Sequence, residues 1–351
     1  MPSIAKPAAV HPSLHKNALG LTIRDYEGAM STLCAGCGHD SVTAAITRAL
    51  WEVSMPPHML AKMSGIGCSS KTPTYFVSGA HGFNSAHGRM AAIATGANAA
   101  NREMTYIGIS GDGDSLSIGL GHMCHAIRRN VKMLYVIENN GVYGLTKGQF
   151  SASADVGSKS KRGEANRMAP IDPVALGLSL GATFIARSFS GDKEQLVPIL
   201  KAGLSHRGFA IVDVISPCVT FNDHEGSTKS YKYPRQHEKK LTESDFVPPA
   251  SEILATIGNT GTTTVTMHDG SVVRFTGVPK DYDPTDRRRV TSYLQDHQEQ
   301  GEVVTGLLYL DESVPDLHEM SNSPETALWK VPFEKLCPGS AELKKLQEDY
   351  R

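Results

Sequence analysis

The sequence of 351 residues contains no apolar run of membrane-spanning length and no excess of either charge. Lysine and arginine together number 35, and aspartate and glutamate together number 36, so the net charge is close to zero. A protein that binds nucleic acid or an anionic membrane through electrostatics needs a basic surplus, which this sequence lacks. We therefore expect neither a nucleic acid nor a membrane among its partners.

The sequence also lacks an apolar signal core within residues 1–20, and it shows no internal repeat. Its six cysteines are few for a chain that is long enough to bury a sizeable core. A disulfide framework is typical of small secreted domains and is not expected here. We expect a cytoplasmic location.

Helical and extended patterns alternate between residues 25 and 217. Helices are predicted at residues 40–53, 89–101, 115–129 and 193–205, and strands at residues 59–63, 105–110, 132–137, 182–187 and 209–215. This alternation is typical of an α/β fold, in which helices cover both faces of a mostly parallel sheet. Ligands of such folds bind outside the carboxyl ends of the strands, where the connecting loops collect.

The chain is expected to divide into three parts. Residues 1–24 form an N-terminal tail, residues 25–235 form the main domain, and residues 236–351 form a C-terminal extension. Within the extension, apolar and polar residues alternate on both sides of Asp269-Gly270, which predicts a β-hairpin over residues 262–276. The extension is expected to cover the main domain or a partner subunit.

Polar residues follow two of the predicted strands. Gly111-Asp112-Gly113-Asp114 comes directly after residues 105–110, and Asn139-Asn140 follows residues 132–137. The glycines allow a tight turn and a close approach to a ligand, while Asp112 offers an anionic oxygen and the asparagines offer neutral ones. Mg²⁺ prefers oxygen ligands and often shares them with a phosphate group. Either segment alone is also a common turn, but the pair predicts a cradle for a divalent cation and a diphosphate.

Four of the six cysteines lie in predicted turns or at the ends of elements: Cys34, Cys37, Cys68 and Cys218. Four thiolates can hold a 4Fe–4S cluster or a tetrahedral zinc ion. Zinc sites usually show two close pairs, whereas one pair with two distant single cysteines favours iron–sulfur. Cys124 falls within a predicted helix, where a cysteine is typically a small buried hydrophobe, and Cys337 is interpreted as non-ligating.

The order Gly-Asp-Gly and then Asn-Asn resembles the thiamin-diphosphate motif of thiamin enzymes. With the cysteines, the chain resembles the β subunits of 2-oxoacid:ferredoxin oxidoreductases over roughly residues 25–235. The stretches that carry the resemblance are residues 34–39, 65–69, 87–89, 94–97, 111–114, 139–149 and 216–218. The 2-oxoglutarate branch of the family is the most similar, because residues 306–310, 315–318 and 336–339 resemble its C-terminal region too.

The resemblance implies a three-layer thiamin-diphosphate-binding fold and three cofactors. Mg²⁺ would be held by Asp112, Asn140 and the carbonyl of Val142. One 4Fe–4S cluster would be held by Cys34, Cys37, Cys68 and Cys218. Thiamin diphosphate would contact Ile66, Gly67, Cys68, Ser69, His87, Gly113, Asp114, Gly144 and Leu145.

The implied reaction is the CoA-dependent oxidative decarboxylation of 2-oxoglutarate to succinyl-CoA and CO₂, with electrons passed to ferredoxin, and its reverse. The chain shows only one of the two domains that the family's active site needs. A larger α subunit is therefore expected to supply the thiamin-activating glutamate, in an α₂β₂ assembly. Three alternatives are a pyruvate or broad-specificity enzyme, a non-redox thiamin decarboxylase or synthase, and a non-catalytic subunit with a structural Cys₄ zinc site.

Candidate substrate residues flank these motifs. Lys71, three residues after Cys68, is predicted to orient the distal carboxylate of 2-oxoglutarate, the alternative being a surface lysine. Leu145 is predicted to form an apolar wall, and His39 to hydrogen-bond a cluster sulfur or a group of the active site. The basic residues of the polar loop 150–173 are a candidate contact for CoA or ferredoxin, or simply solvated; they are Lys159, Lys161 and Arg162.

Overall fold

Eight strands form the central sheet in the part of the chain that the computed structural model describes, which is residues 4–7, 9–160, 163–241, 243–248, 262–276, 279, 282–337 and 339–350. Their order is β2-β1-β3-β4-β8-β7-β13-β9. The bounds in that order are His81–Asn84, Leu60–Ser64, Thr105–Gly111, Met133–Asn139, Phe209–Ile215, Phe184–Phe189, Val303–Leu310 and Glu238–Lys240. Among the described strands of this sheet, only β7 and β13 pair antiparallel. The predicted α/β fold with a mostly parallel sheet is confirmed.

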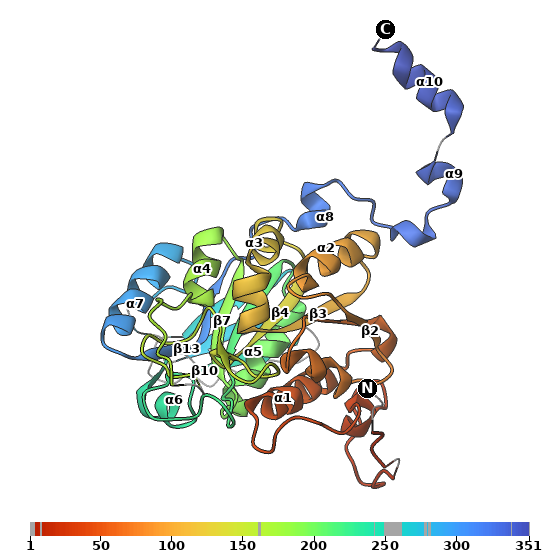
Figure 1. The fold of residues 1–351 in the computed structure, drawn as a ribbon. Helices are drawn as coiled ribbons and strands as arrows, with labels where there is room; N and C mark the ends of the chain where they lie inside the picture. The colour runs from red at the N-terminus through yellow and green to blue at the C-terminus, as the bar shows by residue number, and fades with distance from the viewer. Residues whose placement is uncertain are drawn as a thin grey trace.

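Helices cover both faces of the sheet (Figure 1). On one face α1 (Gly38–Glu52) packs against α5 (Lys193–Ser205). On the other face α2 (Met90–Ala100), α3 (Leu120–Arg128), α4 (Pro173–Leu180) and α7 (Arg287–Glu299) follow one another. Among the described helices, none has the length and apolar character that a membrane crossing requires.

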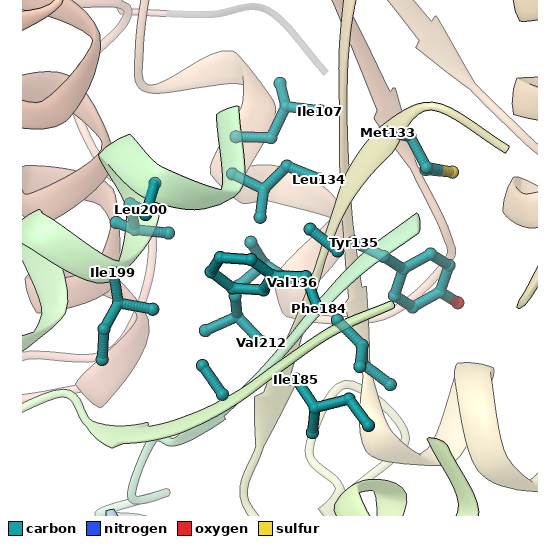
Figure 2. Packing of buried hydrophobic residues seen from close by; sticks show 14 of the residues in the cluster. Ile107, Met133, Leu134, Tyr135, Val136, Phe184, Ile185, Ile199, Leu200 and Val212 are labelled. Atoms are coloured by element: carbon teal, nitrogen blue, oxygen red, sulfur yellow. The ribbon is translucent and has the colours of Figure 1, made fainter. Parts of the chain in front are cut away.

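The core is apolar on both faces of the central strands. Every residue of β4 and β8 is buried, as expected for parallel strands that are covered by helices on both sides. Ile199 and Leu200 of α5 lie on one side of Leu134 and Val136 of β4 (Figure 2). Each such side chain contributes about 1.5–3 kcal/mol on burial, so the strand ends that carry the polar motifs are held rigidly.

One predicted helix is divided in two. Residues 115–129 were expected to form a single helix, but the structure shows a π-helical segment, Gly113–Ile118, and then α3. The division falls at Gly119, which packs against Gly88: a Cβ on Gly119 would lie 2.8 Å from the Gly88 carbonyl oxygen. This close contact of two backbones brings the His87–Gly88 turn next to the loop after β3.

The C-terminal region contributes to both the main sheet and a smaller one. β10 (Glu243–Val247), β12 (Val272–Thr276) and β11 (Thr262–Thr266) form an antiparallel sheet, and the predicted hairpin at Asp269-Gly270 is confirmed. β13 inserts into the main sheet between β7 and β9. The short helices α8 (Leu317–Met320), α9 (Phe333–Leu336) and α10 (Ser340–Glu348) follow, and α10 lies away from the body (Figure 1).

Candidate functional site

Four neighbouring parallel strands end at one edge of the sheet. β1, β3, β4 and β8 end at Ser64, Gly111, Asn139 and Ile215, so the loops that follow them meet in space. A cavity of about 80 Å³ opens among these loops. It is lined by His39, Ile66, Gly67, Cys68, Ser69, His87, Gly111, Asp112, Gly113, Asp114, Ile118, Asn140, Val142, Tyr143, Gly144, Leu145 and Thr146. The structure thus brings all nine predicted thiamin-diphosphate contacts together with all three predicted Mg²⁺ ligands.

Asp112 is fully buried at the end of β3, and its two oxygens have different surroundings. Oδ2 accepts hydrogen bonds from the Gly141 N–H at 3.1 Å, from the Ser153 hydroxyl at 2.6 Å and from the Ser151 hydroxyl. Among the described residues, Oδ1 has only a long contact of 3.4 Å from the Asn140 N–H. Burial raises the pKa of Asp112, although the two serine hydroxyls act against that rise. Oδ1 is the oxygen left available for a cation.

Asn140 and Val142 supply two more oxygens beside Asp112. The Asn140 side-chain oxygen accepts the Val142 N–H at 3.1 Å, and the Asn140 carbonyl accepts the Asn222 side chain at 2.8 Å. Between them Gly141 has a φ of +75°, a conformation that favours glycine. A carboxylate, an amide and a carbonyl from the ends of two adjacent strands form the hard, all-oxygen donor set that suits Mg²⁺.

Asp114 faces the same cavity but is already bound to the protein. Its Oδ1 accepts the Gly88 N–H at 2.8 Å, and its Oδ2 accepts the Ser110 hydroxyl at 2.9 Å. Asp114 therefore fastens the His87–Gly88 turn to the end of β3. Gly65 makes this arrangement feasible, because a Cβ there would lie 2.0 Å from Asp114 Oδ2.

The four candidate cluster cysteines come from loops that touch one another. The Gly38 N–H donates to the Pro217 carbonyl at 3.1 Å, which places Cys37 next to Cys218. A Cβ on Gly144 would lie 3.3 Å from the Cys68 sulfur and 3.8 Å from the Cys218 sulfur. Among the described residues, no three His, Cys, Asp or Glu side chains are arranged to hold a single metal ion. Of the other cysteines, Cys124 is half-buried and Cys337 is exposed.

Burial favours the protonated form of the thiols of Cys37, Cys68 and Cys218, and backbone groups lie close to Cys218. Burial raises the pKa of the Cys37 thiol to about 12, and it raises the pKa of Cys68 and Cys218 too. The backbone N–H groups of Phe221 and Asn222 donate to the Cys218 carbonyl at 3.2 and 2.9 Å. Together with the backbone of Thr220 they lie close to the Cys218 thiol and oppose the rise in its pKa. Backbone N–H groups close to the sulfur of a cluster ligand are among the features that tune iron–sulfur potentials.

A buried histidine and glutamate lie between the cysteines and the oxygen donors. His39 Nδ1 is 2.6 Å from the Ser216 hydroxyl and 3.6 Å from Glu138 Oε2, and Nε2 is 3.5 Å from the Asn140 side chain. Burial lowers the pKa of His39 to about 4 and raises that of Glu138 well above its usual value. Burial thus favours the uncharged form of both groups, and His39 is neutral near pH 7. Sequence analysis missed Glu138, although a carboxylate inside an apolar strand is itself a signal.

The two other candidate substrate residues lie differently. Leu145 is 50% exposed at the cavity, and Ile118 beside it is 44% exposed, so the rim is apolar and open. Lys71 lies on the 3₁₀ turn Ser69–Thr74, half-buried, and it does not line the cavity. Burial raises the pKa of Cys68, while the positive charge of Lys71 lowers it. Lys71 therefore lies beside Cys68, on the cysteine side of the cavity.

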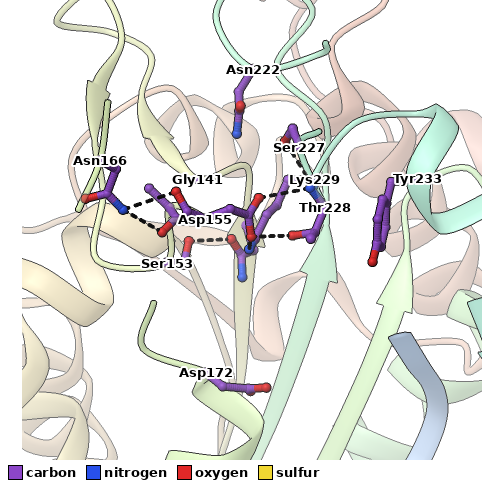
Figure 3. A network of polar contacts seen from close by, with 12 residues as sticks. Gly141, Ser153, Asp155, Asn166, Asp172, Asn222, Ser227, Thr228, Lys229 and Tyr233 are labelled. Carbon is purple, nitrogen blue, oxygen red and sulfur yellow. Dashed lines mark hydrogen bonds and ion pairs between the residues drawn. The ribbon is translucent and has the colours of Figure 1, made fainter. Parts of the chain in front are cut away.

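Sequence analysis also missed Ser151 and Ser153, which donate to Asp112. They belong to the loop after β6 (Gln149–Phe150). This loop continues to Asp155, which accepts the Lys229 ammonium at 2.8 Å and the Thr228 hydroxyl at 2.7 Å (Figure 3). The alternation of two serines and an aspartate is the only local signal, and the partners of these residues are distant in sequence.

Three comparisons show which known proteins the chain is similar to. A family model described as thiamine pyrophosphate enzyme, C-terminal TPP binding domain, matches residues 65–214. The chain is 42% identical over 216 residues to the 2-oxoacid:ferredoxin oxidoreductase subunit beta of Saccharolobus solfataricus, covering 61% of this chain and 68% of that protein. It is 39% identical over 220 residues to the 2-oxoglutarate oxidoreductase subunit KorB of Mycobacterium tuberculosis, covering 60% and 58%.

A solved structure is similar over most of both chains. It is a 2-oxoglutarate:ferredoxin oxidoreductase from Magnetococcus marinus with 2-oxoglutarate, coenzyme A and succinyl-CoA bound. The TM-score is 0.70 at 28% identity, and the match covers 90% of this chain and 96% of that chain.

Proposed function

The chain belongs to the β-subunit family of the 2-oxoacid:ferredoxin oxidoreductases, and from this premise we propose that it is the β subunit of a 2-oxoglutarate:ferredoxin oxidoreductase. The enzyme would convert 2-oxoglutarate and CoA to succinyl-CoA and CO₂, pass the electrons to ferredoxin, and also run in reverse. One observation carries this proposal. Cys68 lines the cavity of the oxygen donors and also lies beside Cys218. The loop that carries Cys68 is therefore next to both the Mg²⁺ donors and the cysteines.

The residues fit three cofactors. Asp112, Asn140 and the Val142 carbonyl would hold Mg²⁺, and the glycine-rich turns 65–69 and 111–114 would hold the diphosphate of thiamin. Cys34, Cys37, Cys68 and Cys218 would hold a 4Fe–4S cluster. When bound, thiamin diphosphate supplies a nucleophilic carbon and an electron sink for decarboxylation, and the cluster accepts electrons one at a time.

Other features of the site come from the chain's own residues. Asp112 presents one oxygen to the cation, while neutral His39 occupies the space between Ser216 and Asn140 without adding charge. Leu145 and Ile118 offer an apolar rim from which a covering surface would exclude water. Among the described residues that line the cavity there is no glutamate. The activating glutamate would therefore come from a larger α subunit, in a cytoplasmic α₂β₂ enzyme.

Two finer assignments also belong to the proposal. Lys71 would orient the distal carboxylate of 2-oxoglutarate, so Lys71→Ala should lose more activity on 2-oxoglutarate than on 2-oxobutyrate, and equal losses would reject the role. Lys159 would help to contact CoA or ferredoxin, together with Lys161 and Arg162, which lie outside the described residues. Residues 25–235 would form the cofactor-binding unit, residues 1–24 a tail and residues 236–351 the extension.

A pyruvate or broad-specificity enzyme is the second candidate, because curated relatives such as that of Saccharolobus solfataricus carry the general 2-oxoacid name. The test is viologen reduction by the anaerobically co-purified α–β complex with CoA and either 2-oxoglutarate or pyruvate. We expect reduction with 2-oxoglutarate, and its loss in Cys218→Ser. A preference for pyruvate would favour the second candidate. Zinc without iron in the complex would favour a structural Cys₄ site instead.

A further inference from the structure

Asp112 is held in one orientation by groups that all act on the same oxygen. Within the described part of the chain, Oδ2 accepts three hydrogen bonds, two of them from serine hydroxyls, while Oδ1 has only the 3.4 Å contact. A carboxylate that is free to rotate can offer a cation either one oxygen or both. Because the hydrogen bonds at Asp112 are concentrated on Oδ2, the carboxylate has one oxygen, Oδ1, to offer to a cation.

The serine at 153 is itself anchored to the central sheet. Its single proton is shared between Asp112 Oδ2 at 2.6 Å and the Asn139 side-chain oxygen at 2.8 Å. The Asn139 amide donates to Asp213 at 2.9 Å, and the other oxygen of Asp213 accepts Arg187 Nε at 2.8 Å. Ser153 and Asn139 are buried, so the orientation of Asp112 is tied to β4, β8 and β7 through one continuous chain of hydrogen bonds.

We propose that Ser153, supported by Ser151, is a positioning residue that fixes Asp112 so that Oδ1 alone faces the divalent cation. The proposal rests on the proposed function, because it requires the Mg²⁺ site. Mg²⁺ demands nearly ideal octahedral geometry with single-oxygen ligands, whereas Ca²⁺ accepts carboxylates through one or two oxygens at longer distances. By holding Oδ2, the serines favour Mg²⁺ over Ca²⁺. Groups that orient a metal ligand are worth about 10- to 100-fold in metal affinity.

The chain offers a matched control in the same loop. The hydroxyl of Ser158 is also buried but has no hydrogen-bond partner among the described residues. Ser158→Ala therefore removes a buried hydroxyl without touching the metal ligand. Ser153→Thr keeps the hydroxyl and is the conservative variant that should restore function, while Ser151→Ala removes the second donor to Asp112.

The experiment is a titration of the purified α–β complex with Mn²⁺ in the presence of thiamin diphosphate, with free Mn²⁺ measured by its EPR signal. We expect Ser153→Ala and Ser151→Ala to raise the dissociation constant about 10- to 100-fold. Ser158→Ala should change it less than about twofold, and Ser153→Thr should recover most of the loss. In competition with Ca²⁺, the Ser153→Ala complex should lose affinity for Mn²⁺ more than for Ca²⁺.

Each outcome has a distinct meaning. Wild-type affinity in both alanine variants would overturn the positioning role, and so would equal losses for Mn²⁺ and Ca²⁺, since a general disturbance of the loop affects both ions. If Ser153→Ala does not fold, Ser151→Ala carries the same test. No thiamin-dependent binding of Mn²⁺ by the wild-type complex would instead contradict the proposed function itself.

Discussion

At the scale of single residues, Gly144 allows the oxygen donors of the cavity and the candidate cluster cysteines to lie close together. Gly144 lies between the cavity and the cysteines, and a Cβ at this position would meet the Cys68 sulfur at 3.3 Å. That distance is tighter than ordinary van der Waals contact, and the sulfur would be a cluster ligand that cannot easily yield. The packing around Gly144 therefore leaves no room for a larger side chain.

Gly144→Ala should therefore reduce iron and acid-labile sulfide per chain by about twofold or more, because overpacking of this kind costs about 1–3 kcal/mol. Gly121→Ala is the control, since a Cβ on Gly121 meets nothing within 4 Å. The measurement is the iron content of anaerobically purified complexes of the Gly144→Ala and Gly121→Ala variants. Full iron content in Gly144→Ala would show that no cluster lies against this residue.

At the scale of elements, the start of α4 shows how a cap and an ion pair combine. Asp172 accepts the N–H groups of Val174 and Ala175 and pairs with Arg187. Burial alone would raise the pKa of Asp172, but Arg187 and the two N–H groups hold it below 3.8. A lowered carboxyl pKa stabilises the fold above the unfolded pKa, and this stability is lost as the pH falls through the folded pKa.

Asp172→Ala should lower the free energy of unfolding by about 0.5–2 kcal/mol, the usual value of such a cap. The difference from wild type should be the same at about pH 7 and pH 5 and should shrink only below about pH 4. Asp172→Asn should lose less, because asparagine keeps the cap. Urea unfolding of the complex across this pH range is the measurement, and a difference that already shrinks between pH 7 and pH 5 would contradict the assignment.

The strands and the strand-end motifs were predictable because their signals are local. Asp112 and Asn140 follow apolar runs that form β3 and β4, and the predicted hairpin at Asp269-Gly270 is present. Ser153 and Glu138 were not predicted, because their partners lie far away in sequence: Asn139 and Asp112 for Ser153, and Thr72 and His39 for Glu138.

Two features of the fold depend on tertiary packing and not on the local sequence pattern. The helix expected over residues 115–129 is divided where Gly119 meets Gly88, a contact between segments that no helical periodicity reveals. β13 pairs with β7 inside the main sheet, although residues 303–310 belong to the region predicted as an extension. The structure gathers the predicted thiamin-diphosphate contacts and Mg²⁺ ligands in one cavity, whereas Lys71, Cys34, Cys37 and Cys218 do not line it. The roles of all these residues stay predictions.

At the scale of the whole molecule, the cavity is open to solvent at an apolar rim. Its rim includes Leu145 and Ile118, which are 50% and 44% exposed. The carboxylates that line it, Asp112 and Asp114, are both bound to protein groups. Under the proposed function, an activating carboxylate and a covering surface would come from another chain.

The purified chain alone should therefore show no turnover of 2-oxoglutarate, and addition of the α subunit should restore it. The assay is CoA-dependent viologen reduction under anaerobic conditions with thiamin diphosphate and Mg²⁺ present. Because cofactor ligands of the chain are intact, the isolated chain should still retain iron. Full activity without the α subunit would refute the need for a partner.

The central claim is that the oxygen donors and the four cysteines form one redox unit. The most direct measurement is the EPR spectrum of the anaerobically purified α–β complex, frozen after 2-oxoglutarate and CoA are added. We predict the signal of a reduced 4Fe–4S cluster that appears with the substrate and is absent both without it and in Cys218→Ser. A complex that holds thiamin diphosphate and iron but gives no substrate-dependent signal would contradict the account.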